Sequence, residues 1–248
     1  MHTPVSNQII RLGQTESTNR QLLQLSSQES LEEGAVLVAD FQTHGRGQGS
    51  NVWESDSGKN LTFSILFYPV FLRASEQFII SKAVSLAMCD FISRFVAGVS
   101  VKWPNDVYVG KQKITGILIE NTVEGQYLKK TIAGIGVNIN QERFFSNAPN
   151  PVSLFQLTGK HFNLEECLTE VLQAINARYK QIVEGYAATL HDDYLRHLYR
   201  LGEWAPFSAA GETFEARITG VNSVGMLEMI TRDNQLRTFG FKEVEFVK

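Results

Sequence analysis

Three segments of the chain carry apolar residues at the three-to-four-residue spacing of a helix that buries one face. They are residues 75–95, residues 164–185 after a capping Asn163, and residues 187–200. A shorter helix over about 17–25 would begin at a Ser-Thr pair, and such residues commonly cap helices. The pattern therefore predicts four helices.

Short apolar runs bounded by turn residues predict strands between these helices. The runs are residues 35–39, 61–68, 99–103, 114–120 and 131–139. Because helices and strands do not alternate strictly, the order favours an α+β fold with a mixed β-sheet flanked by helices.

Beyond about Gly202 the pattern changes to short strands and turns, with expected strands over 214–218, 226–230 and 236–241. A stretch this short is typical of a small β-barrel. We therefore expect residues 1–200 to form the main domain, and residues 201–248 to form a small C-terminal β-barrel domain.

Composition narrows the class of protein. The 248 residues hold 23 Lys and Arg against 26 Asp and Glu, so there is no basic excess that would indicate nucleic acid or an anionic membrane. We find no signal peptide and no apolar run long enough to span a bilayer. The two cysteines form no disulfide framework, and the five histidines lack metal-ligand spacing. We expect a cytoplasmic protein without a fixed metal site.

A glycine-rich loop separates two of the expected strands. Residues 45–51 read Gly-Arg-Gly-Gln-Gly-Ser-Asn, and Trp53 follows. Unshielded backbone N–H groups can wrap an anion, and Arg46 adds a positive charge. Because no helix follows, the loop resembles neither a P-loop nor a Rossmann turn. A flexible hairpin loop without a ligand would have the same glycine spacing.

The strand expected over 131–139 has an unusual face. Its period of two puts Gly134, Gly136 and Asn138 on one side and only apolar residues on the other. Gly116 lies in the neighbouring expected strand. Glycines inside strands often mark the close approach of a ligand or of another backbone. The pattern favours a flat floor for a thin ligand, although tight packing against the chain itself would also explain it.

The block Lys-Trp-Pro-Asn-Asp at 102–106 sets a carboxylate and an amide at the end of a strand, with Lys111 and Lys113 following. These cations would suit a phosphate group. An ordinary turn with solvated lysines is the alternative.

These segments, in this order, resemble the biotin protein ligase family. The matching stretches, all within residues 17–140, are 17–19, 42–53, 102–106, 113–120 and 134–140. The resemblance implies a catalytic domain followed by an SH3-like β-barrel. It also implies that biotin and ATP, with Mg²⁺, form biotinyl-adenylate and pyrophosphate. A lysine of a biotin carboxyl carrier protein domain then attacks the adenylate and releases AMP.

The resemblance also implies roles for single residues. Lys113 matches the lysine that faces the biotin carboxylate and the α-phosphate, and Arg46 and Asp106 join it as expected catalytic residues. Asp106 would help to hold Mg²⁺ or would orient the incoming lysine, and the sequence leaves both open. The expected biotin contacts are Ser17, Thr18, Gln42, Gly45, Arg46, Gly47, Lys113, Gly116, Ile117, Gly134 and Gly136. The expected ATP or adenylate contacts are Arg46, Gln48, Trp53, Asn105, Asp106, Lys113 and Asn138.

The chain departs from the family at two places. Many members have a loop of the form Gly-Arg-Gly-Arg-Arg-Gly-Arg, whereas Arg46 is the only arginine of this loop. The stretch before Ser17 is also too short for the three helices, each about 11–12 residues long, of an N-terminal DNA-binding domain. We therefore expect the monofunctional form, without operator binding. A homodimer is possible, because the family often pairs sheet edges.

Three alternatives stay open at this point. A lipoate or octanoate transferase would share the fold and differ in its acid. A vitamin or nucleotide sensor would bind biotin or ATP without releasing pyrophosphate. A globular domain could use its glycines for packing alone. The Lys-Trp-Pro-Asn-Asp block favours biotin, and the presence of both Lys113 and Asp106 argues against a sensor.

Overall fold

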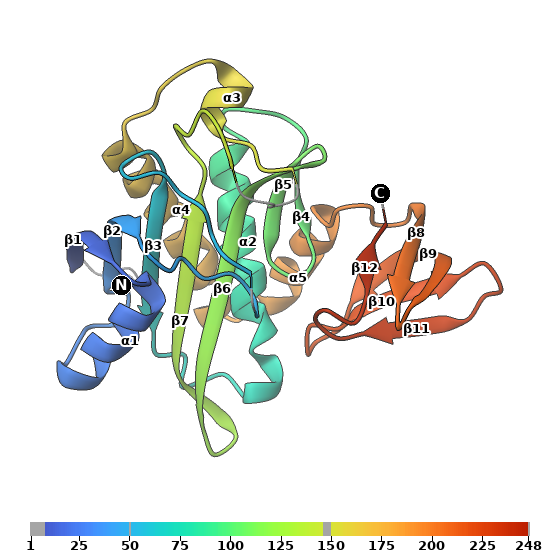
Figure 1. The fold of residues 1–248 in the computed structure, drawn as a ribbon. Helices are drawn as coiled ribbons and strands as arrows, with labels where there is room; N and C mark the ends of the chain where they lie inside the picture. The colour runs from blue at the N-terminus through green and yellow to red at the C-terminus, as the bar shows by residue number, and fades with distance from the viewer. Residues whose placement is uncertain (1–7, 50, 146–149, 248) are drawn as a thin grey trace.

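The computed structural model describes residues 8–49, 51–145 and 150–247. A seven-stranded sheet with the order β1-β2-β3-β7-β6-β5-β4 forms its larger part (Figure 1). The strands are β1 (Ile9–Thr15), β2 (Val36–Gln42), β3 (Leu61–Phe67), β4 (Val99–Lys102), β5 (Asp106–Val109), β6 (Gln112–Glu124) and β7 (Tyr127–Val137). Only the β1–β2 pair is parallel among these described strands, so the mixed sheet is confirmed.

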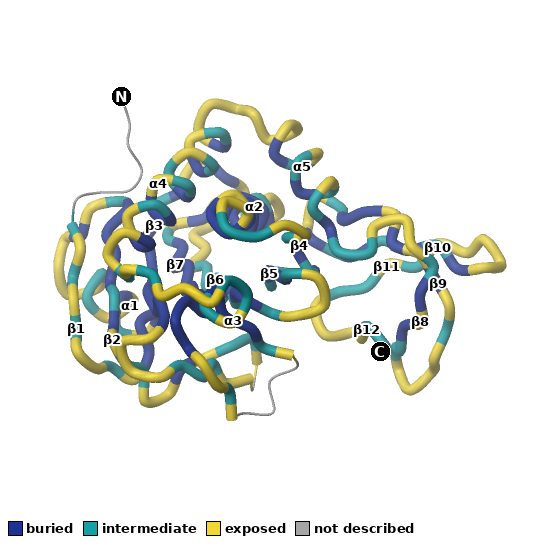
Figure 2. The backbone as a smooth tube through the Cα atoms, turned by 90° about the horizontal axis from the view of Figure 1, so that it is seen from above, coloured by how far each residue is buried: buried dark blue, intermediate teal, exposed yellow. Residues whose placement is uncertain are grey.

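Helices cover both faces of this sheet. They are α1 (Thr18–Gln28), α2 (Phe78–Ile92), α3 (Leu154–Thr158), α4 (Leu164–Val183) and α5 (Ala187–Arg196). Helices α2, α4 and α5 lie on one face, and α1 lies on the other (Figure 2). The main core fills the space between the sheet and α2 and α4, and a smaller cluster around Leu22 lies under α1.

The predicted helices are confirmed, with shifted ends. Helix α2 begins at Phe78, three residues later than expected, because a 3₁₀ turn over Ala74–Glu76 precedes it. Helix α4 begins after Asn163, whose side chain accepts from two backbone N–H groups as expected of a cap. The short helix α3 was not expected from the sequence.

A second, antiparallel sheet follows α5. Its order is β11-β10-β9-β8-β12. The strands are β8 (Trp204–Ala209), β9 (Glu212–Val221), β10 (Leu227–Thr231), β11 (Leu236–Phe239) and β12 (Glu245–Phe246). This sheet fits the small C-terminal β-barrel that the change of pattern predicts. The division of the chain at residues 200 and 201 stays a prediction.

Aromatic contacts hold the second sheet against the first part of the chain. The Trp103 indole Nε1 donates to the carbonyl of Gly225 at 2.8 Å. The Phe241 ring lies 5.4 Å from the Trp103 ring and 5.9 Å from the Phe78 ring, measured between centroids. The buried core is therefore continuous from α2 to the C-terminal sheet.

Four of the strands were not expected from the sequence, namely β1, β5, β8 and β12. Strand β5 begins at Asp106, at the position where the sequence suggested only a turn, and it has four residues. Strand β8 contains Pro206, a residue that normally argues against a strand. Among the described residues, no helix has both the length and the apolar content that crossing a bilayer requires.

Candidate ligand pocket

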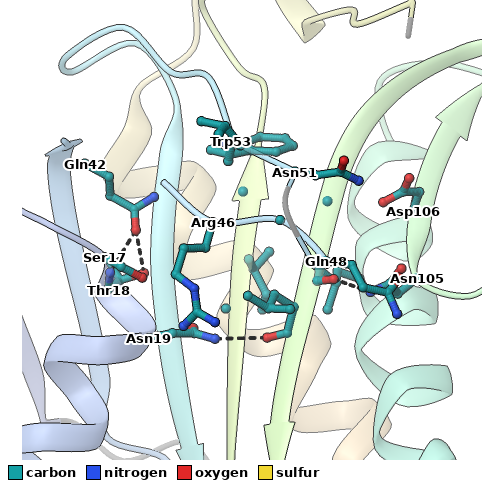
Figure 3. A pocket seen from close by; sticks show the side chains of 18 of the residues that line it. Ser17, Thr18, Asn19, Gln42, Arg46, Gln48, Asn51, Trp53, Asn105 and Asp106 are labelled. Carbon is teal, nitrogen blue, oxygen red and sulfur yellow. Dashed lines mark hydrogen bonds between the residues drawn. The ribbon is translucent and has the colours of Figure 1, made fainter. Parts of the chain in front are cut away.

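The glycine face of β7 forms the floor of a pocket of about 750 Å³, part of which is open to solvent. Figure 3 shows Ser17, Thr18 and Gln42 at one end, and Gln48, Asn51, Asn105 and Asp106 at the other. The predicted residues that line it are Ser17, Thr18, Gln42, Arg46, Gly47, Gln48, Trp53, Asn105, Asp106, Lys113, Gly116, Ile117, Gly134 and Gly136.

Strand register produces the floor. Gly136 pairs with Gly116 of β6 on one side and with Thr62 of β3 on the other, so these three positions share a face. The close approach predicted for the glycines is made by side chains of the chain itself. A Cβ on Gly136 would lie 2.6 Å from the Trp53 Nε1, and one on Gly116 would lie 2.8 Å from the Trp53 Cζ3. The floor is therefore shaped to take a flat ring.

A connected network of hydrogen bonds forms the polar end. Gln42 Oε1 accepts from the Thr18 N at 2.8 Å and from the Thr18 Oγ1 at 3.1 Å. The Ser64 Oγ lies 2.7 Å from the Thr18 Oγ1 and 2.6 Å from the Asn19 Oδ1. Ser17 is the N-cap residue of α1, and its side chain makes no capping bond. These groups offer several donors and acceptors to a small polar head.

Asn19 belongs to the Ser-Thr-Asn segment that matches the family but was left out of the expected biotin contacts, and Ser64, which supports this end from behind the lining, was missed. The Asn19 Nδ2 donates to the Glu120 Oε2 at 2.8 Å, and the Asn19 side chain lies directly over Gly134. Ser64 belongs to β3, which is buried throughout. Hydroxyl residues at every second position of an otherwise apolar strand were the signal that could have identified Ser64. Asn51, Val52, Pro104, Leu118 and Ile135 also line the pocket without having been predicted.

The other end of the pocket holds an ion pair. The Lys113 Nζ on β6 lies 2.7 Å from the Asp106 Oδ1 on β5, and the two side chains are 23% and 28% exposed. The Trp53 ring centroid lies 5.9 Å from the same Nζ. The amide of Asn105 donates to the carbonyl of Ile117 and thereby ties the turn to β6. A fixed ammonium group therefore faces the floor at this end.

Ile117 contributes its backbone rather than its side chain. It pairs with Ile135 on the face opposite to Gly116, and its side chain is part of the buried core. Ile117 does line the pocket, and because successive side chains of a strand point to opposite faces it offers its backbone there. Its place along biotin stays a prediction.

The glycine-rich loop folds back on itself as a hairpin. The Trp53 N donates to the Gly45 O at 2.9 Å, and the Gly47 N donates to the Asn51 O at 2.7 Å. These two N–H groups are therefore not free to wrap an anion. A Cβ on Gly45 would lie 2.5 Å from the Trp53 carbonyl oxygen, so this glycine allows the hairpin to close. Gly45 does not itself line the pocket, and Ser50 of the same loop lies outside the described residues.

Arg46 lies at the polar end, away from Lys113. Its Nη1 makes a 3.0 Å ion pair with Glu120, the carboxylate that also accepts from Asn19. The pair is partly exposed, which limits its contribution to stability.

Asn138 is not among the residues that line the pocket. It follows the last residue of β7, and its Nδ2 donates to the Val152 carbonyl at 3.0 Å. Its Oδ1 is buried without a hydrogen-bond partner among the described residues. Its expected contact with the adenine stays a prediction.

Lys102 also lies outside the lining, and burial lowers the pKa of its ammonium group. Its Nζ lies 4.8 Å from the Phe246 ring centroid and 5.1 Å from the Tyr108 ring centroid. Lys102 therefore links the second sheet to the strand that precedes Asp106.

Within the described part of the chain, no group of three or more His, Cys, Asp or Glu side chains is placed to hold a metal ion.

Comparisons with known proteins agree with this arrangement. The model of the biotin/lipoate A/B protein ligase family matches residues 12–138. A biotin–[acetyl-CoA-carboxylase] ligase of Paracoccus denitrificans is 30% identical over 87% of this chain and 91% of its own length. The structure of a biotin protein ligase from Aquifex aeolicus in complex with biotin and ATP superimposes with a TM-score of 0.81 at 25% identity, over 98% of this chain and 100% of that one.

A longer relative is the bifunctional ligase/repressor BirA of Bacillus spizizenii, which is 29% identical over 81% of this chain. The chain spans 63% of the length of that relative. The match of the family model covers about half of the chain and includes the whole pocket floor. The chain belongs to the biotin/lipoate A/B protein ligase family.

Proposed function

We propose that the chain activates biotin with ATP to give biotinyl-adenylate and then transfers biotin to a lysine of a biotin carboxyl carrier protein domain. The observation that carries this proposal is the pocket with two unlike ends. A closed polar network around Thr18 and Gln42 lies at one end, and the Lys113 ammonium lies at the other. The Aquifex relative with biotin and ATP supports the same pair of substrates.

Biotin fits this pocket in one direction. Its ureido group needs hydrogen-bond donors and acceptors, which Thr18, Gln42 and Asn19 supply. Its thin rings and chain would lie over Gly134 and Gly136, where larger residues would intrude. Its carboxylate would then reach Lys113. The Trp53 indole lies on this floor in the structure, so it has to rise with its loop and cover the ligand.

The first step joins a carboxylate to a phosphate, and both groups are negatively charged. A carboxylate oxygen attacks the α-phosphorus, the bond between the α-phosphorus and the oxygen that bridges it to the β-phosphorus breaks, and pyrophosphate leaves with the electron pair of that bond. Lys113 stabilises the charge shared by the two oxygens in the transition state. Asp106 holds the Lys113 ammonium in place through the 2.7 Å ion pair. In the second step the acceptor amine attacks the acyl carbon and AMP leaves.

Mg²⁺ accompanies ATP in this proposal. Asp106 is the carboxylate at the Lys113 end, and Mg²⁺ typically uses one or two carboxylates together with substrate phosphates. The bound ion would screen the phosphate charge. No dedicated metal cage among the described residues is needed for that role.

A carrier domain of a biotin-dependent carboxylase is the proposed acceptor, in line with the Paracoccus relative, a biotin–[acetyl-CoA-carboxylase] ligase. A homodimer, a cytoplasmic location and the absence of DNA binding stay predictions from the sequence.

The test is ATP–pyrophosphate exchange with Mg²⁺ and with biotin, lipoate or no acid. We expect exchange that depends on biotin and that Lys113→Ala abolishes. Lys111→Ala is the matched control, because Lys111 is exposed and does not line the pocket. Exchange with lipoate would assign the chain to the lipoate branch of the family. Measurable biotin binding without exchange would instead favour a sensor.

A further inference from the structure

The two cations that line the pocket are both neutralised by carboxylates. Lys113 pairs with Asp106, and Arg46 pairs with Glu120 at the polar end. The tip of the glycine-rich loop adds only uncharged side chains such as Gln48. A polyphosphate carries several negative charges and needs cations in its site. Once Glu120 beside the lining is included, the charges of these two pairs cancel, so that requirement is not met.

A lysine from the second sheet reaches the loop at this point. Lys242 lies in the turn between β11 and β12, with φ 67°, and its side chain lies against Gly49. A methyl group on Gly49 would overlap the Lys242 ammonium and would lie 2.9 Å from its Cε. Gly49 itself has φ +68°. The missing side chain at position 49 therefore leaves the space that the ammonium group occupies.

The turn that carries Lys242 is held in place. The Phe241 ring packs between Trp103 and Phe78, and the Gly240 N donates to the Glu243 Oε2 at 2.6 Å. Lys242 is exposed, and it has no ion-pair partner among the residues that the structure describes. Its charge is thus available to a ligand without the loss of an ion pair, whereas Lys113 and Arg46 are already paired.

The position of Lys242 matches the phosphate end of the site. Gly49 follows Gln48, which lies beside Asn105 and opposite to the Thr18 end (Figure 3). Gln48 also lines a second cavity of about 650 Å³, and Phe241 lines that cavity too. Lys242 therefore lies near the junction of the two cavities. A leaving pyrophosphate must point away from the attacking carboxylate, and Gln48 and Asn105, at the end of the pocket opposite to Thr18, line both cavities.

We propose that Lys242 binds the β- and γ-phosphates of ATP and replaces, from the C-terminal sheet, the positive charge that this arginine-poor loop lacks. The proposal rests on the proposed function and names a binding residue for its ATP. The adenylate keeps only the α-phosphate, so Lys242 acts on ATP and pyrophosphate and not on the second step.

The experiment is ATP titration by calorimetry, with biotinol present because this alcohol analogue of biotin cannot be adenylated. Lys242→Met should weaken ATP binding by about tenfold or more, as expected for one lost charge-assisted contact. Biotin binding and the transfer from preformed biotinyl-adenylate should stay at the wild-type level. Lys160→Met removes an equal charge from an exposed position outside the pocket and is the matched control.

A second variant separates charge from loop anchoring. Gln48→Arg placed in Lys242→Met returns a cation to the loop and should recover most of the ATP affinity. Unchanged ATP affinity in Lys242→Met would overturn the proposal. An equal loss of biotin and ATP affinity would overturn it too, because Lys242 would then only hold the loop. Exchange by the wild-type protein tests the proposed function separately, since these titrations need no reaction.

Discussion

Gly136→Ala tests directly whether the glycine floor is the surface on which the ligand lies. The added Cβ would lie 2.5 Å from the Cζ2 and 2.6 Å from the Nε1 of the Trp53 indole. Ordinary contacts of this kind begin near 3.4 Å and the Cε2 lies closer still, so the ring has to retreat by about 1 Å. A flat ligand on the same floor meets the same methyl group.

The expected size follows from the cost of overpacking. Extra methyl groups in a well-packed site cost about 1–3 kcal/mol, which corresponds to about 5- to 150-fold in affinity. We expect the KM for biotin in the exchange assay to rise within this range. Because the indole is displaced, the fluorescence spectrum of Trp53 should shift as well.

Gly13→Ala provides the control. Gly13 lies in a strand of the same sheet, and a Cβ there would meet no atom within 4 Å. We expect wild-type values for this variant. A Gly136→Ala protein with an unchanged KM for biotin and an unchanged fluorescence spectrum would refute the assignment of this face as the ligand floor.

Three further outcomes follow from the structure. Arg46→Ala should weaken adenylate binding by about 3 kcal/mol. The free energy of unfolding should change little, because the ion pair with Glu120 is partly exposed. Retention of the adenylate at the wild-type level on gel filtration would contradict this prediction. Burial lowers the pKa of Lys82 to about 8 from an ordinary 10.5, so the unfolded chain binds more protons between these values and the free energy of unfolding should rise across that window. Lys82→Met should remove this rise in unfolding midpoints measured against pH. Trp103→Phe leaves the carbonyl of Gly225 without its hydrogen-bond donor. The free energy of unfolding measured in urea should fall by about 1–2 kcal/mol. An unchanged urea midpoint would show that this hydrogen bond does not hold the second sheet.

Local pattern was sufficient for most elements and for much of the pocket. The period of two along β7 correctly placed Gly134 and Gly136 on a face opposite to a row of apolar residues. Helix α4 was predicted from its stripe and from Asn163, because a cap and a helical period are properties of one continuous segment. The resemblance to biotin protein ligases supplied the roles of Lys113 and Asp106, and the structure brings these two residues into contact.

Other features depend on pairings that no local pattern contains. The sequence places Ile117 beside Gly116, and only the strand geometry directs its side chain into the core. Arg46 could be recognised as the only arginine of its loop, but its pairing with Glu120 needs the fold of β6 beside that loop. Asn138 was expected to reach the pocket, whereas the segment at Val152 holds its amide.

The sequence by itself determined the class of fold, the glycine face and the identity of the polar groups, because these follow from short-range periodicity and from residue types. The tertiary structure alone decided which groups meet. Strand register set Gly136 opposite Gly116, and the docking of the second sheet brought Lys242 to Gly49, a residue about three quarters of the chain length away. The physical reason is that strand register and the docking of the second sheet depend on the burial of apolar surfaces that are distant in sequence. Many residues contribute to this burial, and no single motif determines it.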